Sequence, residues 1–533
     1  MGMRPNIVII NPDQMRADAL GHLGNRASRT PFLDRLARTD AVSFRNAFCQ
    51  NPVCVPSRCS FLTGLYPHVN GHRTMLHMLH SHETSLFKEL KDAGYYVWMN
   101  ARNDFLAAQE ETLFEQHATE IFYGGNIAPP PGPKENVRGA PGSKHFYSFY
   151  VGELQVDEQG RNHTFDDEAV NKSIEFLQNY SQDEPFCLFL GLEKPHPPYK
   201  IEAPYFHAIN RQKLPERIQL SEEELAKKPK ALKELIKEMN TDLLDEKDWD
   251  ELRACYLGMC MKVDEYVQSI CEALKEKGIY DNTAIFIFSD HGDYTGDYNL
   301  VEKAQNTFED CLVNVPLLIK PPKGYPLDAG VSDSLVELVD FYATTMDMCG
   351  VTPTHSHFGK SLVPILENRS REIREFVYCE GGRLAEEAHC SESRGRAPHP
   401  FSIYYPRMKV QQDDVAHTKA TMIRSDKFKY ILRKYEMDEF YDLKKDPQEK
   451  NNEIDNPEYR NEIMEMKQAM LEWYQTTCDI VPFTPDRRDS YAMTWNRIKV
   501  YCPKELEDEV KEKIHGGMGY YPLMEWLSQR KSR

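Results

Sequence analysis

Short, continuous apolar runs alternate with amphipathic stretches over the first 320 residues or so. An apolar run without polar alternation is typical of a strand that is buried on both faces of a sheet. The stretches between the runs carry apolar residues at helical spacing. Alternation of this kind favours a mainly parallel sheet with helices on both faces. The runs are Ile7–Ile10, Tyr95–Met99, Phe186–Leu192, Ala284–Phe288 and Val315–Ile319, and the clearest helical patterns are Leu86–Ala93, Glu168–Tyr180 and Tyr256–Lys277.

The pattern changes after about residue 370. Thr421–Leu432 alternates as a strand with one exposed face would, and a helical pattern follows around Tyr459–Thr476. We therefore expect an α/β domain over residues 1–370 and a smaller C-terminal α+β domain over residues 371–533 that ends in an aromatic-rich tail.

Two insertions interrupt the strand–helix alternation. Residues 104–165 are irregular and rich in proline, whereas residues 203–250 are charged and helical. Each insertion could form part of a lid over a binding site or a solvated excursion on the surface, and the sequence leaves both interpretations open.

The charge balance limits the kinds of partner. The chain carries 65 basic and 83 acidic residues, a net charge of −18. This balance argues against a nucleic-acid backbone or an anionic membrane surface as the main partner. If the substrate is an anion, the basic residues that bind it must be focused in one cleft.

The cysteines and the N-terminal residues bear on the compartment. Thirteen cysteines are scattered along the chain, an odd number that fits a reducing compartment better than a disulfide framework. The apolar run near the start is too short for a signal-peptide core, and no apolar stretch is long enough to span a membrane. We therefore expect a cytoplasmic protein.

A reactive side chain, a helix start and a guanidinium lie within one short segment. Residues 54–58 read Cys-Val-Pro-Ser-Arg, and the spacing of Phe61 and Leu65 predicts a helix that starts there. Cys54 would then lie at the helix N-terminus, where free N–H groups and the helix dipole favour anions. Arg58 is four residues on and returns to the same face. The segment predicts a pocket for a tetrahedral oxyanion beside a reactive side chain.

Polar side chains follow two of the predicted strands. Asp13 and Gln14 come after the first run, and Asp290 and His291 come after Ala284–Phe288. An α/β sheet binds its ligands beyond the carboxyl ends of its strands, so the two aspartates would meet if their strands are neighbours. Carboxylate and amide oxygens favour Ca²⁺, and an imidazole among the ligands leaves Mn²⁺ open. Each aspartate could instead be only a turn or helix cap.

Together, these segments resemble the sulfatase family. That family has Cys-x-Pro-Ser-Arg followed by a Thr-Gly-x-Tyr-Pro stretch, and later Ser-Asp-His-Gly or Ser-Asp-Asn-Gly. Here Cys54–Arg58 leads without a gap into Thr63–Pro67, and Ser289–Gly292 reads Ser-Asp-His-Gly. The resemblance implies an alkaline-phosphatase-like fold: a large mixed, mainly parallel sheet sandwiched by helices, with a smaller C-terminal domain built on an antiparallel sheet.

The resemblance also implies a modified cysteine and a metal. In the family this cysteine is oxidised to formylglycine, so a formylglycine-generating enzyme would be a partner of the chain. Asp13, Asp290 and His291 would bind the cation together with the modified Cys54. Gln14 departs from the commoner aspartate, which makes it a weak ligand or only a neighbour of the metal.

Four further residues follow from the same resemblance. Lys303 would hold the sulfate group, and His196, in the run Pro-His-Pro-Pro-Tyr, would protonate the leaving group. Arg102 and Asp104 stand where other members carry lysine and histidine. Arg102 can only stabilise charge, whereas Asp104 could be a base or a hydrogen-bond acceptor.

His77 is a further candidate for contact with substrate, because a loop after the signature often has this role in the family. It lies in a run that also contains His72, His80 and His82. For Lys303 and His196 the alternatives are a solvated lysine and a loop histidine bonded to backbone, and Arg102 and Asp104 could form a structural ion pair.

The sequence thus predicts hydrolysis of aryl, steroid or carbohydrate sulfate monoesters by a metal-bound formylglycine hydrate derived from Cys54. One alternative is a phosphonate monoester or phosphodiester hydrolase of the same superfamily, which Gln14 favours. The other is an unmodified protein that binds sulfated glycans. An oligomer is compatible with the sequence.

Overall fold

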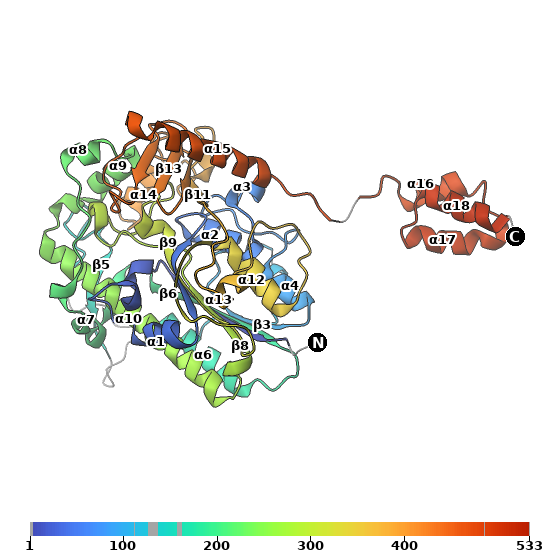
Figure 1. The fold of residues 1–533 in the computed structure, drawn as a ribbon, viewed down its shortest axis with the longest axis horizontal. Helices are drawn as coiled ribbons and strands as arrows, with labels where there is room; N and C mark the ends of the chain where they lie inside the picture. Colours follow the sequence, from blue (N-terminus) through green and yellow to red (C-terminus); the bar gives the residue numbers. More distant parts are fainter. Residues whose placement is uncertain (1–3, 111, 126–136, 157–162, 484–485, 532–533) are drawn as a thin grey trace. The chain divides into compact units, whose positions relative to one another are not determined.

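The structure is a computed structural model with two compact units, residues 1–480 and residues 481–533 (Figure 1). The domain boundary that the sequence predicts near residue 370 falls inside the first unit and stays a prediction. Described residues are 4–110, 112–125, 137–156, 163–483 and 486–531.

An eight-stranded sheet forms the centre of the first unit. The strand order is β10-β2-β9-β8-β1-β6-β3-β4. β9 runs antiparallel to β2 and β8, and the other neighbouring strands are parallel. All five apolar runs are strands of this sheet, so the predicted large mixed, mainly parallel sheet is confirmed. The strands are β1 (Asn6–Asp13), β2 (Val42–Phe48), β3 (Tyr96–Asn100), β4 (Glu120–Phe122), β6 (Phe186–Pro195), β8 (Thr283–Phe288), β9 (Asn314–Lys320) and β10 (Gly330–Glu337).

β2 and β10 were not found from the sequence, because polar residues interrupt their apolar pattern. Arg45 and Asn46 lie in β2, and Asp333 lies in β10. The Arg45 guanidinium contacts the Asp333 carboxylate at 2.8 Å, and the Asn46 amide donates to the Asp333 carbonyl. These polar side chains face solvent near the sheet edge, so neither strand needs a continuous apolar run.

Helices cover both faces of the sheet (Figure 1). The predicted helical patterns correspond to α4 (Leu86–Asp92), α6 (Phe165–Asn179) and α10 (Glu246–Glu276). α6 and α10 pack together with α1 (Pro31–Thr39) on one face, whereas α2 (Cys54–Thr63), α4 and α12 (Val339–Cys349) cover the other.

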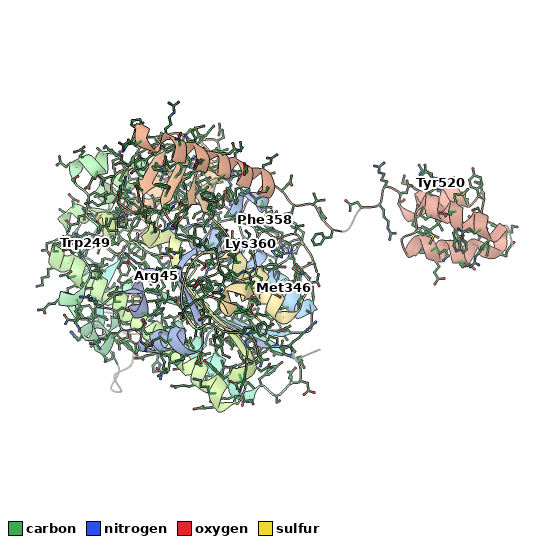
Figure 2. All side chains as sticks on the ribbon, in the orientation of Figure 1. Arg45, Trp249, Met346, Phe358, Lys360 and Tyr520 are labelled. Atoms are coloured by element: carbon green, nitrogen blue, oxygen red, sulfur yellow. The ribbon has the colours of Figure 1, made fainter. Side chains whose placement is uncertain are left out.

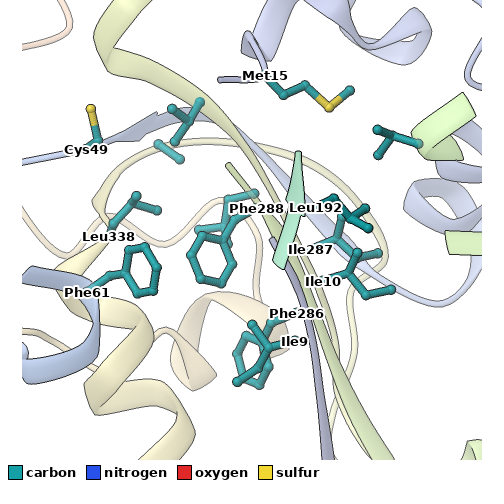
Figure 3. Close-up of a cluster of buried hydrophobic side chains, with 14 of the residues drawn as sticks. Ile9, Ile10, Met15, Cys49, Phe61, Leu192, Phe286, Ile287, Phe288 and Leu338 are labelled. Atoms are coloured by element: carbon teal, nitrogen blue, oxygen red, sulfur yellow. The ribbon is translucent and has the colours of Figure 1, made fainter. Parts of the chain in front are cut away.

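The core lies between the sheet and these helices. Figure 3 shows Phe61 of α2 beside Phe288 of β8. Their rings meet edge to face with centroids 5.0 Å apart, a favourable aromatic geometry. This contact fixes the helix that starts at Cys54 against the strand that leads to Asp290. On the other face, Trp249 of α10 is 1% exposed (Figure 2).

A second, antiparallel sheet follows in the same unit. It contains β11 (Val377–Gly381), β12 (Ala420–Arg424), β13 (Phe428–Arg433) and β14 (Glu439–Asp442) in that order. α15 (Arg460–Thr477) packs on it, and Trp473 stacks on Tyr378 with ring centroids 4.4 Å apart. The antiparallel C-terminal sheet is therefore confirmed.

The single strand predicted over Thr421–Leu432 is wrong. It is a hairpin of β12 and β13, in which Ser425 Oγ accepts hydrogen bonds from the N–H groups of Lys427 and Phe428. No glycine or proline marks this turn, so the sequence pattern hides the break.

The second unit is helical and has its own small core. Figure 2 shows its side chains, including Tyr520 at the start of α18. Ile498, Val510, Ile514 and Leu523 form most of this core. The second unit contains α16 (Tyr491–Ile498), α17 (Glu507–His515) and α18 (Tyr520–Lys531).

Throughout the described parts of the chain, every helix is too short or too polar to cross a bilayer.

The remaining elements lie in the first unit, outside the two sheets described above. Helices in the charged insertion confirm the helical pattern predicted for residues 203–250. The shorter elements are α3 (Pro67–Asn70), α5 (Leu113–His117), β5 (Tyr150–Leu154), β7 (Tyr199–Glu202), α7 (Ala203–Ala208), α8 (Glu222–Ala226), α9 (Lys230–Met239), α11 (Asp310–Val313), α13 (Val363–Glu367) and α14 (Tyr405–Val410).

Candidate active site

Four neighbouring parallel strands, β8, β1, β6 and β3, end at the same edge of the large sheet. Asp13 is the last residue of β1, and Asp290 and His291 follow β8. His196 follows β6, and Arg102 follows β3. The first strand and the strand entering Asp-His-Gly are neighbours, as expected, so residues far apart in sequence converge at one edge.

α2 brings Cys54 to this edge. Cys54 is the first residue of the helix, after Val53 in extended conformation. Its Sγ lies 3.7 Å from Asp13 Oδ1 and 3.2 Å from His291 Nε2. Arg58, one turn further on, reaches Asp13 Oδ2 at 3.1 Å. The predicted helix start and the shared face of Cys54 and Arg58 are confirmed.

Four groups that can bind a metal converge here. One ligand atom from each of Asp13, Cys54, Asp290 and His291 lies within 4.8 Å of the others, and all four residues are buried. His291 donates from Nδ1 to the Gly292 carbonyl, and burial lowers its pKa, so its Nε2 lone pair faces the carboxylates. Lone pairs and anions that face one another need a cation between them, so these residues fit a divalent metal ion.

The Ser-Asp-His-Gly run is held by close backbone packing. The Gly292 N–H donates to the Leu312 carbonyl at 2.7 Å, and a Cβ at Gly292 would lie 2.0 Å from the Cys311 oxygen. Only glycine fits this approach. Ser289 Oγ accepts from the Met15 N–H and donates to the His291 carbonyl, which ties the loop to the end of β1.

Two arginines balance the buried carboxylates. Arg58 bonds Asp290 Oδ2 at 3.0 Å as well as Asp13, and Arg102 also contacts Asp13 Oδ2. Burial alone would raise the pKa of Asp13, but Arg102, Lys303 and other nearby cations outweigh it and hold that pKa well below its usual range. Among the residues that the structure describes, none accepts a hydrogen bond from the buried Arg58 Nη1. This N–H is a donor suited to an anion.

The thiol of Cys54 is a poor nucleophile as it stands. Burial and the nearby Asp13 carboxylate raise its pKa well above the usual value. The thiolate is the reactive form of cysteine, and this environment suppresses it at neutral pH.

Lys303 is buried beside this group, with 1% of its surface exposed, which excludes the solvated lysine considered from the sequence. Its Nζ donates to Gln14 Oε1 at 2.7 Å and lies 3.4 Å from Glu302. Burial opposes its charge, but Cys54, Glu302 and Asp13 raise its pKa above the usual value. Gln14 Nε2 donates to Asp293 at 2.6 Å.

His196 occupies the loop after β6 as a neutral imidazole. Burial, together with Lys303 and Arg102, lowers its pKa well below the ordinary value. Its Nδ1 donates to the Pro197 carbonyl at 2.7 Å, which leaves the lone pair on Nε2. The backbone-bonded loop histidine considered from the sequence is thus present, and its second nitrogen is available for chemistry.

The last two candidates differ in their surroundings. Asp104 Oδ2 lies 3.8 Å from Arg58 and 3.9 Å from Arg102, and its side chain is 27% exposed. His77 is exposed and contacts Thr74 and His389 rather than the metal-binding group. It lines a cavity of about 580 Å³ together with His72, His80 and His82.

Sequence reasoning missed several residues that support the site. Asp293 and Tyr199 are hydrogen-bonded at 2.9 Å. Asp293 lies just beyond Ser289–Gly292, and Tyr199 is the last residue of the His196 run, to which the sequence assigned no role. Arg407, in α14, lies 2.5 Å from both carboxylate oxygens of Glu302. Nothing in the local sequence marked Arg407, because its partner is about a hundred residues away.

The fold is shared with solved structures. The crystal structure of a phosphonate monoester hydrolase of Agrobacterium radiobacter has a TM-score of 0.70 and 20% sequence identity. The match covers 90% of this chain and 100% of that chain. The chain therefore has the fold of this hydrolase, with a candidate metal-binding group at one edge of its large sheet.

The sequence model of the Sulfatase family matches residues 5–351. This chain belongs to the sulfatase family, and it is a sulfuric ester hydrolase. It is 26% identical to the arylsulfatase of Clostridium perfringens, over 88% of this chain and 94% of that protein. It is also 26% identical to the multifunctional alkaline phosphatase superfamily protein PehA of Trinickia caryophylli, over 89% of this chain and 96% of that protein.

Proposed function

We propose that the chain hydrolyses sulfate monoesters at the edge where β8, β1, β6 and β3 end. Asp13, Asp290 and His291 would hold a cation, Ca²⁺ or alternatively Mn²⁺, together with a formylglycine made from Cys54 by a maturation enzyme. The observation that carries this proposal is the convergence of four buried ligand atoms within 4.8 Å beside an unpaired guanidinium N–H. When present, the cation and the hydrated aldehyde supply Lewis acidity and the attacking oxygen.

The residues of the chain bind and orient the ester. Arg58 Nη1 and Lys303 Nζ are buried donors that carry positive charge, so each can hold an oxygen of the transferred group. Fixed donors of this kind stabilise the charge that develops on those oxygens, because they need no reorganisation during the reaction. Arg102 keeps Asp13 ionised for the cation and does not transfer a proton.

Proton transfer falls to two side chains. His196 is neutral in the free enzyme, and a bound anionic ester opposes the shift that Lys303 and Arg102 cause, so it favours protonation at Nε2. From there His196 can protonate the departing oxygen. The Asp104 side chain is partly exposed, and its carboxylate forms ion pairs with Arg58 and Arg102. An ionised carboxylate at this place can act as the base that regenerates the free site.

Phosphonate monoester or phosphodiester hydrolysis is a second candidate function. The specific observation in its favour is Gln14, a neutral amide where the commoner pattern has a carboxylate. An Asp-Gln pair at this place resembles a branch of the superfamily that also includes phosphonate monoester and phosphodiester hydrolases. The similarity to the Agrobacterium radiobacter phosphonate monoester hydrolase supports the same candidate.

A panel of esters on verified protein tests the proposal. Peptide mass spectrometry first establishes whether position 54 carries formylglycine, and the modified protein is then assayed with aryl, steroid and carbohydrate sulfates and with aryl phosphonates. Faster turnover of a sulfate supports the proposed function, and faster turnover of the phosphonates supports the second candidate. A chain that is unmodified in its native host and only binds sulfated glycans would contradict both.

A further inference from the structure

Tyr404 directly precedes α14 and carries a hydroxyl group that is free for a ligand. Its N–H donates to Ser402 Oγ at 3.2 Å, and its carbonyl accepts from the Met408 N–H, so its backbone is satisfied locally. The residue is partly exposed, and among the residues that the structure describes none forms a hydrogen bond with Tyr404 Oη. A phenol hydroxyl can both donate and accept a hydrogen bond.

One contact connects Tyr404 to the loop of Lys303. The guanidinium carbon of Arg407 lies 4.8 Å from the centre of the Tyr404 ring. The same guanidinium bonds both carboxylate oxygens of Glu302 at 2.5 Å, and Glu302 directly precedes Lys303 in the chain. The ring of Tyr404 is therefore held from the side of this loop.

A second contact connects Tyr404 to the loop of His196. The rings of Phe149 and Tyr404 have centroids 5.5 Å apart, and the Phe149 carbonyl accepts from the Tyr199 N–H at 2.9 Å. Tyr199 is the last residue of the His196 run. Phe149 belongs to the irregular insertion over residues 104–165 and has φ of 59°. A bulky residue persists in this left-handed conformation only where its surroundings hold it, which is typical of functional regions.

The electrostatic surroundings of the hydroxyl agree with these two contacts. Burial raises the pKa of Tyr404, and among the charged groups Glu302 raises it further whereas Lys303 lowers it. The hydroxyl is thus within electrostatic range of the candidate site, and it stays protonated at neutral pH. Because it is uncharged, it suits the uncharged part of an ester, which is the leaving group.

The packing of the ring distinguishes between two kinds of leaving group. A flat aryl group would stack on an open ring face, but Arg407 and Phe149 already pack against the ring of Tyr404. The hydroxyl remains available, and it can bond a hydroxyl or an amide of the leaving group. Sugars carry such groups around the whole ring, whereas a phenyl group carries none.

We propose that Tyr404 is a substrate-binding residue that recognises a carbohydrate leaving group through a hydrogen bond to its hydroxyl. This role rests on the proposed function, which places the transferred group at Arg58 and Lys303. It adds a substrate class, the ester of a sugar that carries a hydroxyl or an amide close to the ester oxygen. A site that hydrogen-bonds such a group discriminates against esters that lack it.

The test removes this one hydroxyl. Tyr404→Phe keeps the ring against Arg407 and Phe149, so the thermal unfolding midpoint should match that of the parent. With the fastest carbohydrate sulfate of the panel, kcat/KM should fall about three- to tenfold, the scale of a lost hydrogen bond between uncharged groups. With phenyl sulfate, kcat/KM should stay within about twofold of the parent, because no hydrogen bond is lost.

Tyr405→Phe is the matched control. The Tyr405 ring stacks on Tyr147 with centroids 5.8 Å apart, and the exposed Lys409 places its Nζ 5.7 Å from the centre of the Tyr405 ring. These contacts lead away from Glu302 and its loop. The control should therefore leave the ratio of kcat/KM between the two esters unchanged.

The selectivity between the two esters decides the outcome. A loss confined to the carbohydrate ester in Tyr404→Phe, and absent in Tyr405→Phe, supports the role of Tyr404. Equal losses with both esters, no loss with either, or a parent that turns over only aryl esters would overturn it.

The same comparison separates this role from the proposed function. If the panel identifies phosphonates or phosphodiesters as substrates, carbohydrate and phenyl esters of that acid are compared, so the proposed function can fail while the role of Tyr404 stands. If no ester is turned over, the carbohydrate sulfates are titrated by calorimetry into the parent and Tyr404→Phe in the presence of Ca²⁺. An affinity about three- to tenfold weaker in the variant supports the role, whereas equal affinity, or no binding to the parent, contradicts it.

Discussion

Replacement of Arg58 by methionine should destabilise the protein mainly when no cation is bound. The guanidinium supplies the hydrogen bonds to Asp290 Oδ2 and shares Asp13 Oδ2 with Arg102, whereas Asp290 Oδ1 accepts from backbone N–H groups. Arg58, Asp13 and Asp290 are all fully buried. Removal of one partner from a buried ion pair costs about 3–5 kcal/mol, so Arg58→Met should lose stability in this range in the presence of a chelator.

A divalent cation should offset most of that loss. It would bind the same two carboxylates that Arg58 neutralises, so its affinity should rise when the arginine charge is removed. The measurement is urea unfolding of parent and variant, with EDTA and with saturating Ca²⁺, together with a calorimetric titration of Ca²⁺. Arg45→Met is the control, since its ion pair with Asp333 is exposed at 45% and 80% and surface pairs are worth about 0–1 kcal/mol.

Two results would refute this reasoning. An equal loss of stability in EDTA and in Ca²⁺ would mean that Arg58 and the cation do not share the carboxylates. A loss as small as that of Arg45→Met would mean that the buried ion pairs contribute little, and the proposed geometry of the site would be wrong.

Three further predictions concern the chemistry. Cys54→Ala should abolish ester hydrolysis while the unfolding midpoint stays within a few degrees of the parent, and retained turnover would remove Cys54 from the mechanism. Lys303→Met should lower kcat/KM by about a hundredfold or more, the scale of a lost charge-stabilising donor, and an unchanged steady-state rate would contradict the role of its ammonium. His196 must be protonated to act, and burial and the nearby cations hold its pKa well below the ordinary value, so kcat/KM for alkyl sulfates should fall about tenfold per pH unit through the neutral range. His196→Gln should flatten that profile and leave esters with good leaving groups nearly unaffected, and a parent profile that rises with pH would exclude His196 as the acid.

The sequence indicated the strands of the sheet centre because burial on both faces leaves a local trace. β1, β6 and β8 each carry an apolar run that no helix period explains. β2 and β10 left no such trace, since their polar residues pair with each other across the strands. The hairpin of β12 and β13 has the sequence pattern of one strand because its turn residues, Ser425–Lys427, include no glycine or proline.

The candidate active site, like the fold, could be predicted from the sequence only in part. The sequence by itself determined the chemical types at the ends of β1 and β8 and at the start of α2, because Asp13, Cys54, Asp290 and His291 each belong to a short motif that follows a strand or opens a helix. Only the tertiary structure decided that these ends adjoin, since strand order depends on packing between segments more than two hundred residues apart.

The tertiary structure alone also decided which charges are partnered. It buries Lys303 against Gln14, links Gln14 to Asp293, and leaves one N–H of Arg58 without an acceptor among the described residues. Such contacts have no local sequence pattern, because a hydrogen bond between distant side chains depends on distance and direction in space. The sequence specifies the residue types, whereas their charge states and hydrogen-bond partners depend on burial in the folded protein.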